Sequence, residues 1–132
     1  LPVAGLGFCF GGHLAWHLAA RPELKATASF YGARVSTFSP GGGPPPVQLA
    51  AEIPGRLLVW LGADDSLMPA DEQQAIGSTL RAADPSAERL QCRIAPAAGH
   101  GFMCSQRSDF QPEAAEQGWQ SLLELFGQIA EV

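Results

Sequence analysis

Short apolar segments alternate along the chain with longer amphipathic ones. The apolar segments span residues 1–7, 25–31, 56–61 and 90–95. The run at 56–61 is continuously apolar, as in strands that are buried on both faces of a sheet. Helical periodicity follows at 10–20, at 69–83 and from 113 onward, with Pro-containing turns between the segments. The alternation predicts an α/β fold, a parallel sheet of about four strands with flanking helices on both faces.

Two further segments complete this picture. Residues 39–46 read Ser-Pro-Gly-Gly-Gly-Pro-Pro-Pro and form neither a helix nor a central strand, and 47–52 is a weak helical patch. The last helix is expected to bury one apolar side, which comprises Trp119, Leu122, Leu123, Phe126 and Ile129.

Composition narrows the class of protein. The 132 residues suffice for one domain, and 46% hydrophobic against 16% charged residues is a globular balance. The formal charge of −5 and the lack of a basic cluster argue against nucleic acid and anionic membranes as partners. The longest apolar runs fall far short of the roughly 18–20 residues of a membrane span. Three cysteines at scattered spacing argue against a disulfide framework and for a reducing compartment, so we expect a cytoplasmic location.

A candidate nucleophile lies where the first apolar run meets the first helix. Gly7-Phe8-Cys9-Phe10-Gly11 has the form of a nucleophile elbow, a sharp strand-to-helix turn that exposes the side chain at its apex. We expect a side chain at Gly7 or at Gly11 to collide with the opposite arm of the turn. Cys9 would also lie at a helix N-terminus, which favours a thiolate. The alternative is a buried structural cysteine in a Gly-rich turn.

Two more reactive groups follow predicted strands. Asp64 and Asp65 come after the run at 56–61, and His100 comes after the run at 90–95. Parallel strands end at one edge of the sheet, where catalytic groups collect. The order nucleophile, acid, histidine is that of α/β-hydrolase triads. A histidine deprotonates the thiol, and a carboxylate orients the histidine.

On these motifs the chain resembles the dienelactone hydrolase family of α/β-hydrolases. The resemblance covers essentially the whole chain: the elbow through Gly12, the segments 30–32, 62–69 and 99–102, and the tail residues Arg107, Ala114, Ala115 and Trp119. It implies a Cys9-His100-Asp65 triad, because the family's acid falls on Asp65, with Asp64 as a turn residue. It further implies hydrolysis of a small-molecule carboxylic ester or lactone, an oxyanion-hole contact from the Phe10 N–H, and no metal or organic cofactor.

Substrate contacts are less well defined by the sequence. Tyr31, Phe102 and Arg107 are candidates, with packing as the alternative for the two aromatic residues. Dienelactone-cleaving members carry an arginine four residues after the histidine, whereas this chain has Cys104 there and Arg107 nearby. This departure argues against a dienelactone as the substrate and leaves the expected hydrolysis unaffected. His13 and His17 have a metal-ligand spacing, but no third ligand is evident, so we expect no metal site.

The resemblance implies a considerably longer chain, with the additional part expected before Leu1. We therefore expect residues 1–132 to be a single truncated domain, the C-terminal half of an α/β-hydrolase fold. The first strand would then have an unpaired edge, which another segment, another chain or a second copy must cover. A homodimer through this edge is one expectation. A second hypothesis is a non-catalytic α/β module that assembles through the same edge.

Overall fold

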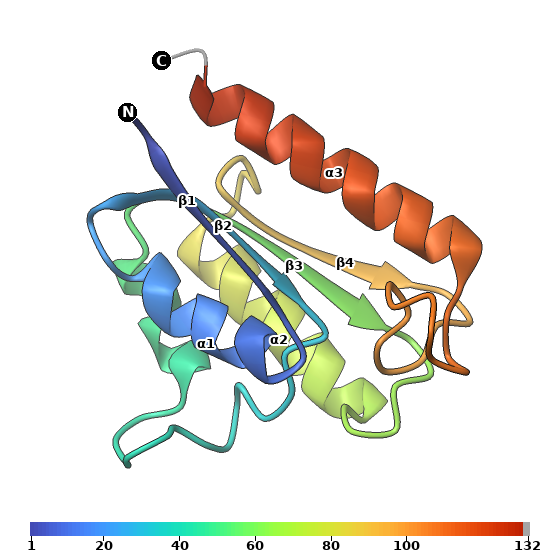
Figure 1. Ribbon diagram of the computed structural model, residues 1–132. Helices are drawn as coiled ribbons and strands as arrows, with labels where there is room; N and C mark the ends of the chain where they lie inside the picture. The colour runs from blue at the N-terminus through green and yellow to red at the C-terminus, as the bar shows by residue number, and fades with distance from the viewer. Residues whose placement is uncertain (131–132) are drawn as a thin grey trace.

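The computed structural model describes residues 1–130 as a four-stranded parallel sheet between two layers of helices (Figure 1). All three neighbouring pairs of strands are parallel, and the order across the sheet is β1-β2-β3-β4. The elements in chain order are β1 (Val3–Phe8), α1 (Phe10–Ala19), β2 (Leu24–Phe30), the 3-10 helix η1 (Pro46–Glu52), β3 (Arg56–Gly62), α2 (Ala70–Ala83), β4 (Leu90–Ala95) and α3 (Pro112–Ala130).

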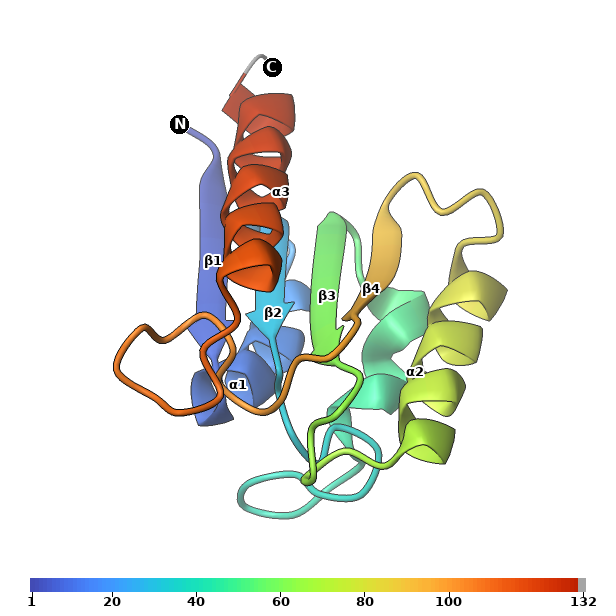
Figure 2. The ribbon, with the colours of Figure 1, turned by 90° about the vertical axis from the view of Figure 1, so that its right-hand side faces the viewer.

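The strand order explains where the helices lie. Each strand is placed beside its predecessor, so the sheet grows in one direction and never reverses. Right-handed crossovers in one direction put every connecting helix on the same face. Accordingly α1, η1 and α2 share one face, and α3, which leads to no further strand, covers the other (Figures 1 and 2). The expected α/β class, with a parallel sheet and helices on both faces, is confirmed.

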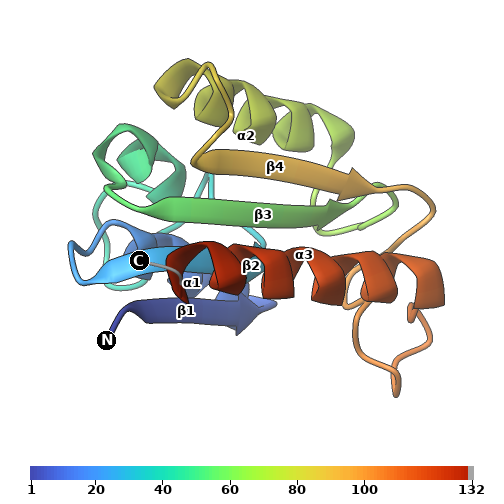
Figure 3. The same ribbon diagram turned by 90° about the horizontal axis from the view of Figure 1, so that it is seen from above.

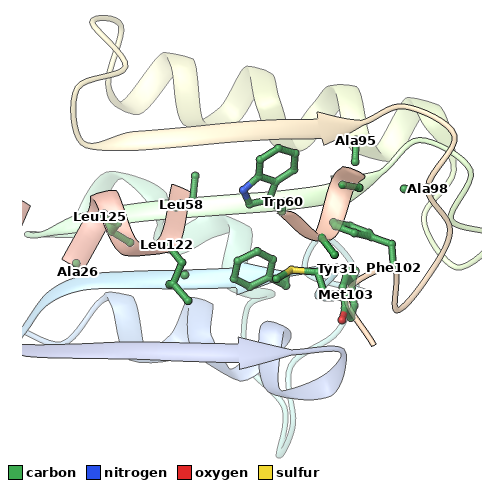
Figure 4. Packing of buried hydrophobic residues seen from close by; sticks show 14 of the residues in the cluster. Ala26, Tyr31, Leu58, Trp60, Ala95, Ala98, Phe102, Met103, Leu122 and Leu125 are labelled. Atoms are coloured by element: carbon green, nitrogen blue, oxygen red, sulfur yellow. The ribbon is translucent and has the colours of Figure 1, made fainter. Parts of the chain in front are cut away.

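Alternation along the strands divides the core into two layers. Leu58 and Trp60 of β3 face α3, whereas Leu57, Val59 and Leu61 face α1 and α2. Figure 4 shows the α3 side, where Leu122 and Leu125 lie over the strands and Phe102 packs beside Trp60. Both faces of β3 are therefore buried, which accounts for its unbroken apolar sequence.

The predicted boundaries hold to within a few residues, with one difference on the last helix. The weak helical patch expected at 47–52 is a 3-10 helix over Pro46–Glu52. The expected apolar side of the last helix was partly wrong, because Leu122, Leu125 and Ile129 are buried while Trp119 and Leu123 are 45% and 69% exposed. Figure 3 shows α3 running along the sheet above β2, and on its flank toward β1 the Trp119 ring lies with its centroid 6.0 Å from that of Phe8.

The outer edge of β1 has no strand partner within residues 1–130. This agrees with the unpaired first-strand edge that the sequence predicts. In the same part of the chain, none of the helices has the length and hydropathy of a membrane span.

Candidate active site

Cys9 occupies a strained position between β1 and α1. Its backbone has φ 55° and ψ −121°, a left-handed conformation that is uncommon for a residue with a Cβ. Two hydrogen bonds hold the turn: the Cys9 N–H donates to Phe30 O at 3.1 Å, and the His13 N–H donates to Cys9 O at 3.1 Å. Such strain is a feature of active-site residues that the surrounding structure fixes in place.

Only some of the glycines around Cys9 are required for steric reasons, and they are not the pair that the sequence suggested. A Cβ at Gly7 would lie 1.9 Å from Gly11 O, so the expected collision is present on the strand side. A Cβ at Gly11 would meet nothing within 4 Å, so the expectation for that residue was wrong. The reason is directional, because the close approach involves the Gly11 carbonyl while its own Cβ position points outward. The tight position on the helix is Gly12, where a Cβ would lie 2.6 Å from Phe30 O.

The environment of Cys9 raises the pKa of its thiol. Partial burial raises the pKa of Cys9, and the charges of Asp65 and Cys104 raise it further, while the Arg107 guanidinium lowers it. Loss of solvation on burial therefore opposes the thiolate form that a helix N-terminus favours. A thiol with a raised pKa needs a neighbouring base before it attacks.

Asp65 and His100 form a hydrogen-bonded pair. Asp65 lies in the turn after β3 with 4% of its surface exposed, and His100 lies in the loop after β4. His100 Nδ1 is 2.9 Å from Asp65 Oδ2, and the other carboxylate oxygen accepts the Leu67 N–H at 2.8 Å. Asp64 is exposed, and its backbone N–H donates a hydrogen bond to Ala98 O. With Asp65 as acceptor, Nδ1 carries the proton and Nε2 is left as the basic nitrogen.

Cys9 and His100 line one pocket of about 310 Å³ at the carboxyl edge of the sheet. Among the described residues no hydrogen bond joins their side chains, a looseness that is common before substrate binds. Phe10 opens α1 at this pocket, and its N–H belongs to the first helical turn, which has no acceptor within the helix. The remaining walls come from residues that sequence reasoning did not assign to a pocket: His13, Ala33, Arg34, Phe38 and Leu67.

Comparison with known proteins identifies the family. A sequence model described as "Dienelactone hydrolase family" matches residues 2–130. The chain belongs to the dienelactone hydrolase family. A relative from Synechocystis sp., named "Putative carboxymethylenebutenolidase", is 36% identical over 124 residues, which cover 94% of this chain and 49% of the relative.

Solved structures show the same relationship. The "Putative Dienelactone Hydrolase" of Klebsiella pneumoniae superimposes with a TM-score of 0.76 at 33% identity, covering 95% of this chain and 51% of that one. A dienelactone hydrolase-like promiscuous phosphotriesterase from metagenomic libraries gives a TM-score of 0.74 at 25% identity, with 96% and 52% covered. The chain thus spans about half the length of the dienelactone hydrolase relatives it matches.

The three predicted substrate contacts do not line the pocket. Tyr31 and Phe102 are buried and pack edge to face, with ring centroids 5.1 Å apart (Figure 4). The Tyr31 ring also packs edge-on against the His100 ring, with the two ring centroids 5.3 Å apart. Burial raises the pKa of Tyr31 to about 12. Arg107 is exposed and lies against Gly101, where a Cβ would be 2.4 Å from its Nε.

The two helix histidines pack together and against the loop that follows β2. His13 is buried, with Nδ1 2.9 Å from Ala33 O, and its ring centroid is 5.3 Å from that of His17. Within residues 1–130, no group of three or more His, Cys, Asp or Glu side chains is placed to hold a metal ion. Cys104, at the position where dienelactone-cleaving members carry arginine, is exposed in the loop after His100.

Proposed function

We propose that this chain carries the Cys-His-Asp triad of a carboxylic ester or lactone hydrolase, with Cys9 as nucleophile, His100 as base and Asp65 as its orienting acid. The observation that carries the proposal is the 2.9 Å contact between His100 Nδ1 and Asp65 Oδ2 beside a pocket that Cys9 also lines. The strained backbone of Cys9 is a second support, since structural cysteines need no such conformation.

The reaction proceeds in two halves. His100 Nε2 takes the thiol proton, Cys9 Sγ bonds to the carbonyl carbon, and the bond from that carbon to the alkoxy oxygen breaks. The leaving alcohol takes the proton from His100, and an acyl-thioester stays on Cys9. His100 then deprotonates a water that attacks the thioester, which releases the acid and restores the thiol. Asp65 stabilises the imidazolium that forms in each half.

Charge on the carbonyl oxygen needs donors in both halves. The Phe10 N–H is one donor, and the second is expected from a segment beside β1, because a parallel neighbour there would end next to Cys9. Absence of one donor costs about 10²–10³ in turnover. Without the second donor, acylation and deacylation of Cys9 are both expected to be slow.

The test combines an aryl-ester assay with intact-mass detection of acylation. The chain should gain one acyl group on Cys9 from 4-nitrophenyl acetate, and one equivalent of nitrophenolate should be released in that acylation step. Cys9→Ala should lose both signals, whereas Cys92→Ala, which removes a half-buried thiol of β4, should retain them. Acylation of Cys9→Ala at the parental rate would show that the nucleophile is assigned wrongly.

A second candidate is a non-catalytic module that assembles through the β1 edge as a homodimer. Apolar side chains stay exposed on the three elements around that edge: Val3 and Leu6 of β1, Leu14 and Leu18 of α1, and Trp119 and Leu123 of α3. An open strand between two such flanks favours association. Light scattering that shows an obligate dimer without esterase activity would support this candidate, and a monomer that is acylated on Cys9 would exclude it.

A further inference from the structure

Three large apolar side chains are exposed around the pocket beside Cys9, and each comes from a different part of the fold. Phe10 begins α1 and is 60% exposed, Phe38 lies in the loop after β2 and is 39% exposed, and Leu67 follows Asp65 and is 56% exposed. Scattered exposed apolar residues need no explanation, but three that converge on one concavity indicate a binding surface.

The Phe38 ring packs against two neighbouring side chains, those of Arg34 and His13. The Arg34 guanidinium carbon lies 5.1 Å from the centroid of its ring, and the ring of buried His13 lies 5.8 Å away. The Phe38 N–H also donates to Arg34 O at 3.0 Å, and Arg34 itself has a left-handed backbone with φ 62°. The aromatic face of Phe38 is thus a fixed wall of the pocket rather than a free surface side chain.

The charges of the lining residues further restrict the kind of ligand that this pocket would bind. No carboxylate lines it, and Arg34, which is engaged with Phe38, is its one permanently charged lining residue. A cationic group would find no carboxylate among the lining residues, whereas a flat apolar ring would cover the exposed side chains of Phe10, Phe38 and Leu67. The volume of about 310 Å³ is at the small end for ligand pockets and suits a single ring.

We propose that this pocket is an aryl-binding subsite, which selects esters with a flat apolar ring next to the scissile carbonyl, and that Phe38 is its specificity-determining residue. The role in ester selection rests on the proposed function, since it needs Cys9 as nucleophile. Binding of the ring does not, because Cys9 and the pocket are adjacent whether or not the chain turns over.

The experiment compares alkylation of Cys9 by 2-chloro-N-phenylacetamide and by 2-chloroacetamide. In both reactions Cys9 Sγ bonds to the chlorine-bearing carbon, chloride leaves, and the thiol proton passes to solvent through His100. Rates are read at Cys9 by peptide mass spectrometry and divided by those of N-acetylcysteine. We expect Cys9 to prefer the phenyl reagent by about tenfold, the preference that partial burial of one ring supports.

Phe38→Ala should bring this preference close to one, and Phe38→Leu should keep part of it. Leu123→Ala, which removes an exposed apolar side chain on α3, is the matched control and should keep all of it. A thermal melt of each variant checks folding, and Phe38→Leu carries the test where the alanine variant melts early. Lack of preference in the parent chain, or full preference in Phe38→Ala, would overturn the subsite.

The two proposals fail in different ways. A ring preference without acylation by 4-nitrophenyl acetate keeps the subsite and rejects the hydrolase. Acylation without a ring preference keeps the hydrolase and rejects the subsite.

Discussion

The elbow provides a sharp test of the structure, because it separates two glycines that look equivalent in the sequence. In Gly7→Ala the new Cβ would lie 1.9 Å from Gly11 O and 2.9 Å from Gly12 N, whereas real Cβ contacts stay beyond 3.0 Å. Both neighbours are backbone atoms of α1, so the strand and the helix must separate by about 1 Å rather than a side chain rotating away. Overpacking of this kind costs about 3 kcal/mol or more.

Gly11→Ala is the matched control. Its Cβ meets nothing within 4 Å, and alanine in a first helical turn is better than glycine by up to about 1 kcal/mol. Urea unfolding followed by circular dichroism measures both. With an m-value of about 2 kcal/mol/M, Gly7→Ala should lower the midpoint by about 1.5 M, and Gly11→Ala should leave it unchanged or slightly raised. Equal destabilisation by the two substitutions would refute this account of the turn.

Three other predictions concern the triad, the thiol and the core. Asp65→Asn should slow acylation of Cys9 by about 10²–10⁴-fold, because His100 loses the acceptor that fixes its tautomer. Asp64→Asn changes an exposed neighbour and should be acylated at close to the parental rate. Equal rates for the two variants would contradict the pairing of Asp65 with His100. Because burial raises the pKa of Cys9, its alkylation by iodoacetamide should keep accelerating above the pH at which a free thiol levels off. At pH 8, Arg107→Gln should slow this reaction, because it removes a positive charge that lowers the pKa of Cys9; a faster reaction would disprove the arrangement. Ser121→Ala should cost about 1–3 kcal/mol in urea unfolding, because it leaves the buried Trp60 Nε1–H, now 2.8 Å from Ser121 Oγ, without an acceptor. Ser78→Ala, at an exposed residue of α2, should change the free energy of unfolding by less than about 0.5 kcal/mol.

Asp64 and Asp65, the two acidic residues after β3, show how much of the site the sequence motifs could predict. Sequence position within the family pointed to Asp65, but composition and spacing alone left Asp64 open. The side chains differ only in direction, because the turn aims the Asp65 carboxylate inward at His100 and leaves Asp64 in solvent. Direction within a turn depends on contacts from β4 and its loop, 35 residues away in the chain, which no local pattern encodes.

Helix α3 illustrates the limit of periodicity. The helix itself was evident, yet Trp119 and Leu123 were assigned to its buried side and are exposed. An apolar stripe indicates that a helix packs against another element, but the width of its buried face depends on the surface on which the helix packs. Here that is mainly the β2–β3 part of the sheet, and toward β1 the Trp119 ring meets only the edge of the sheet at Phe8, which leaves 45% of Trp119 exposed.

The sequence by itself determined the succession of strands and helices, the parallel α/β class and the elbow at Cys9, because each depends on the spacing of nearby residues. Only the tertiary structure decided that Asp65 meets His100, that Gly12 rather than Gly11 is sterically required, and that Phe10, Phe38 and Leu67 share one pocket. These features join residues from separate loops at the carboxyl edge of the sheet. Their relative positions follow from strand order and packing, which are properties of the whole chain.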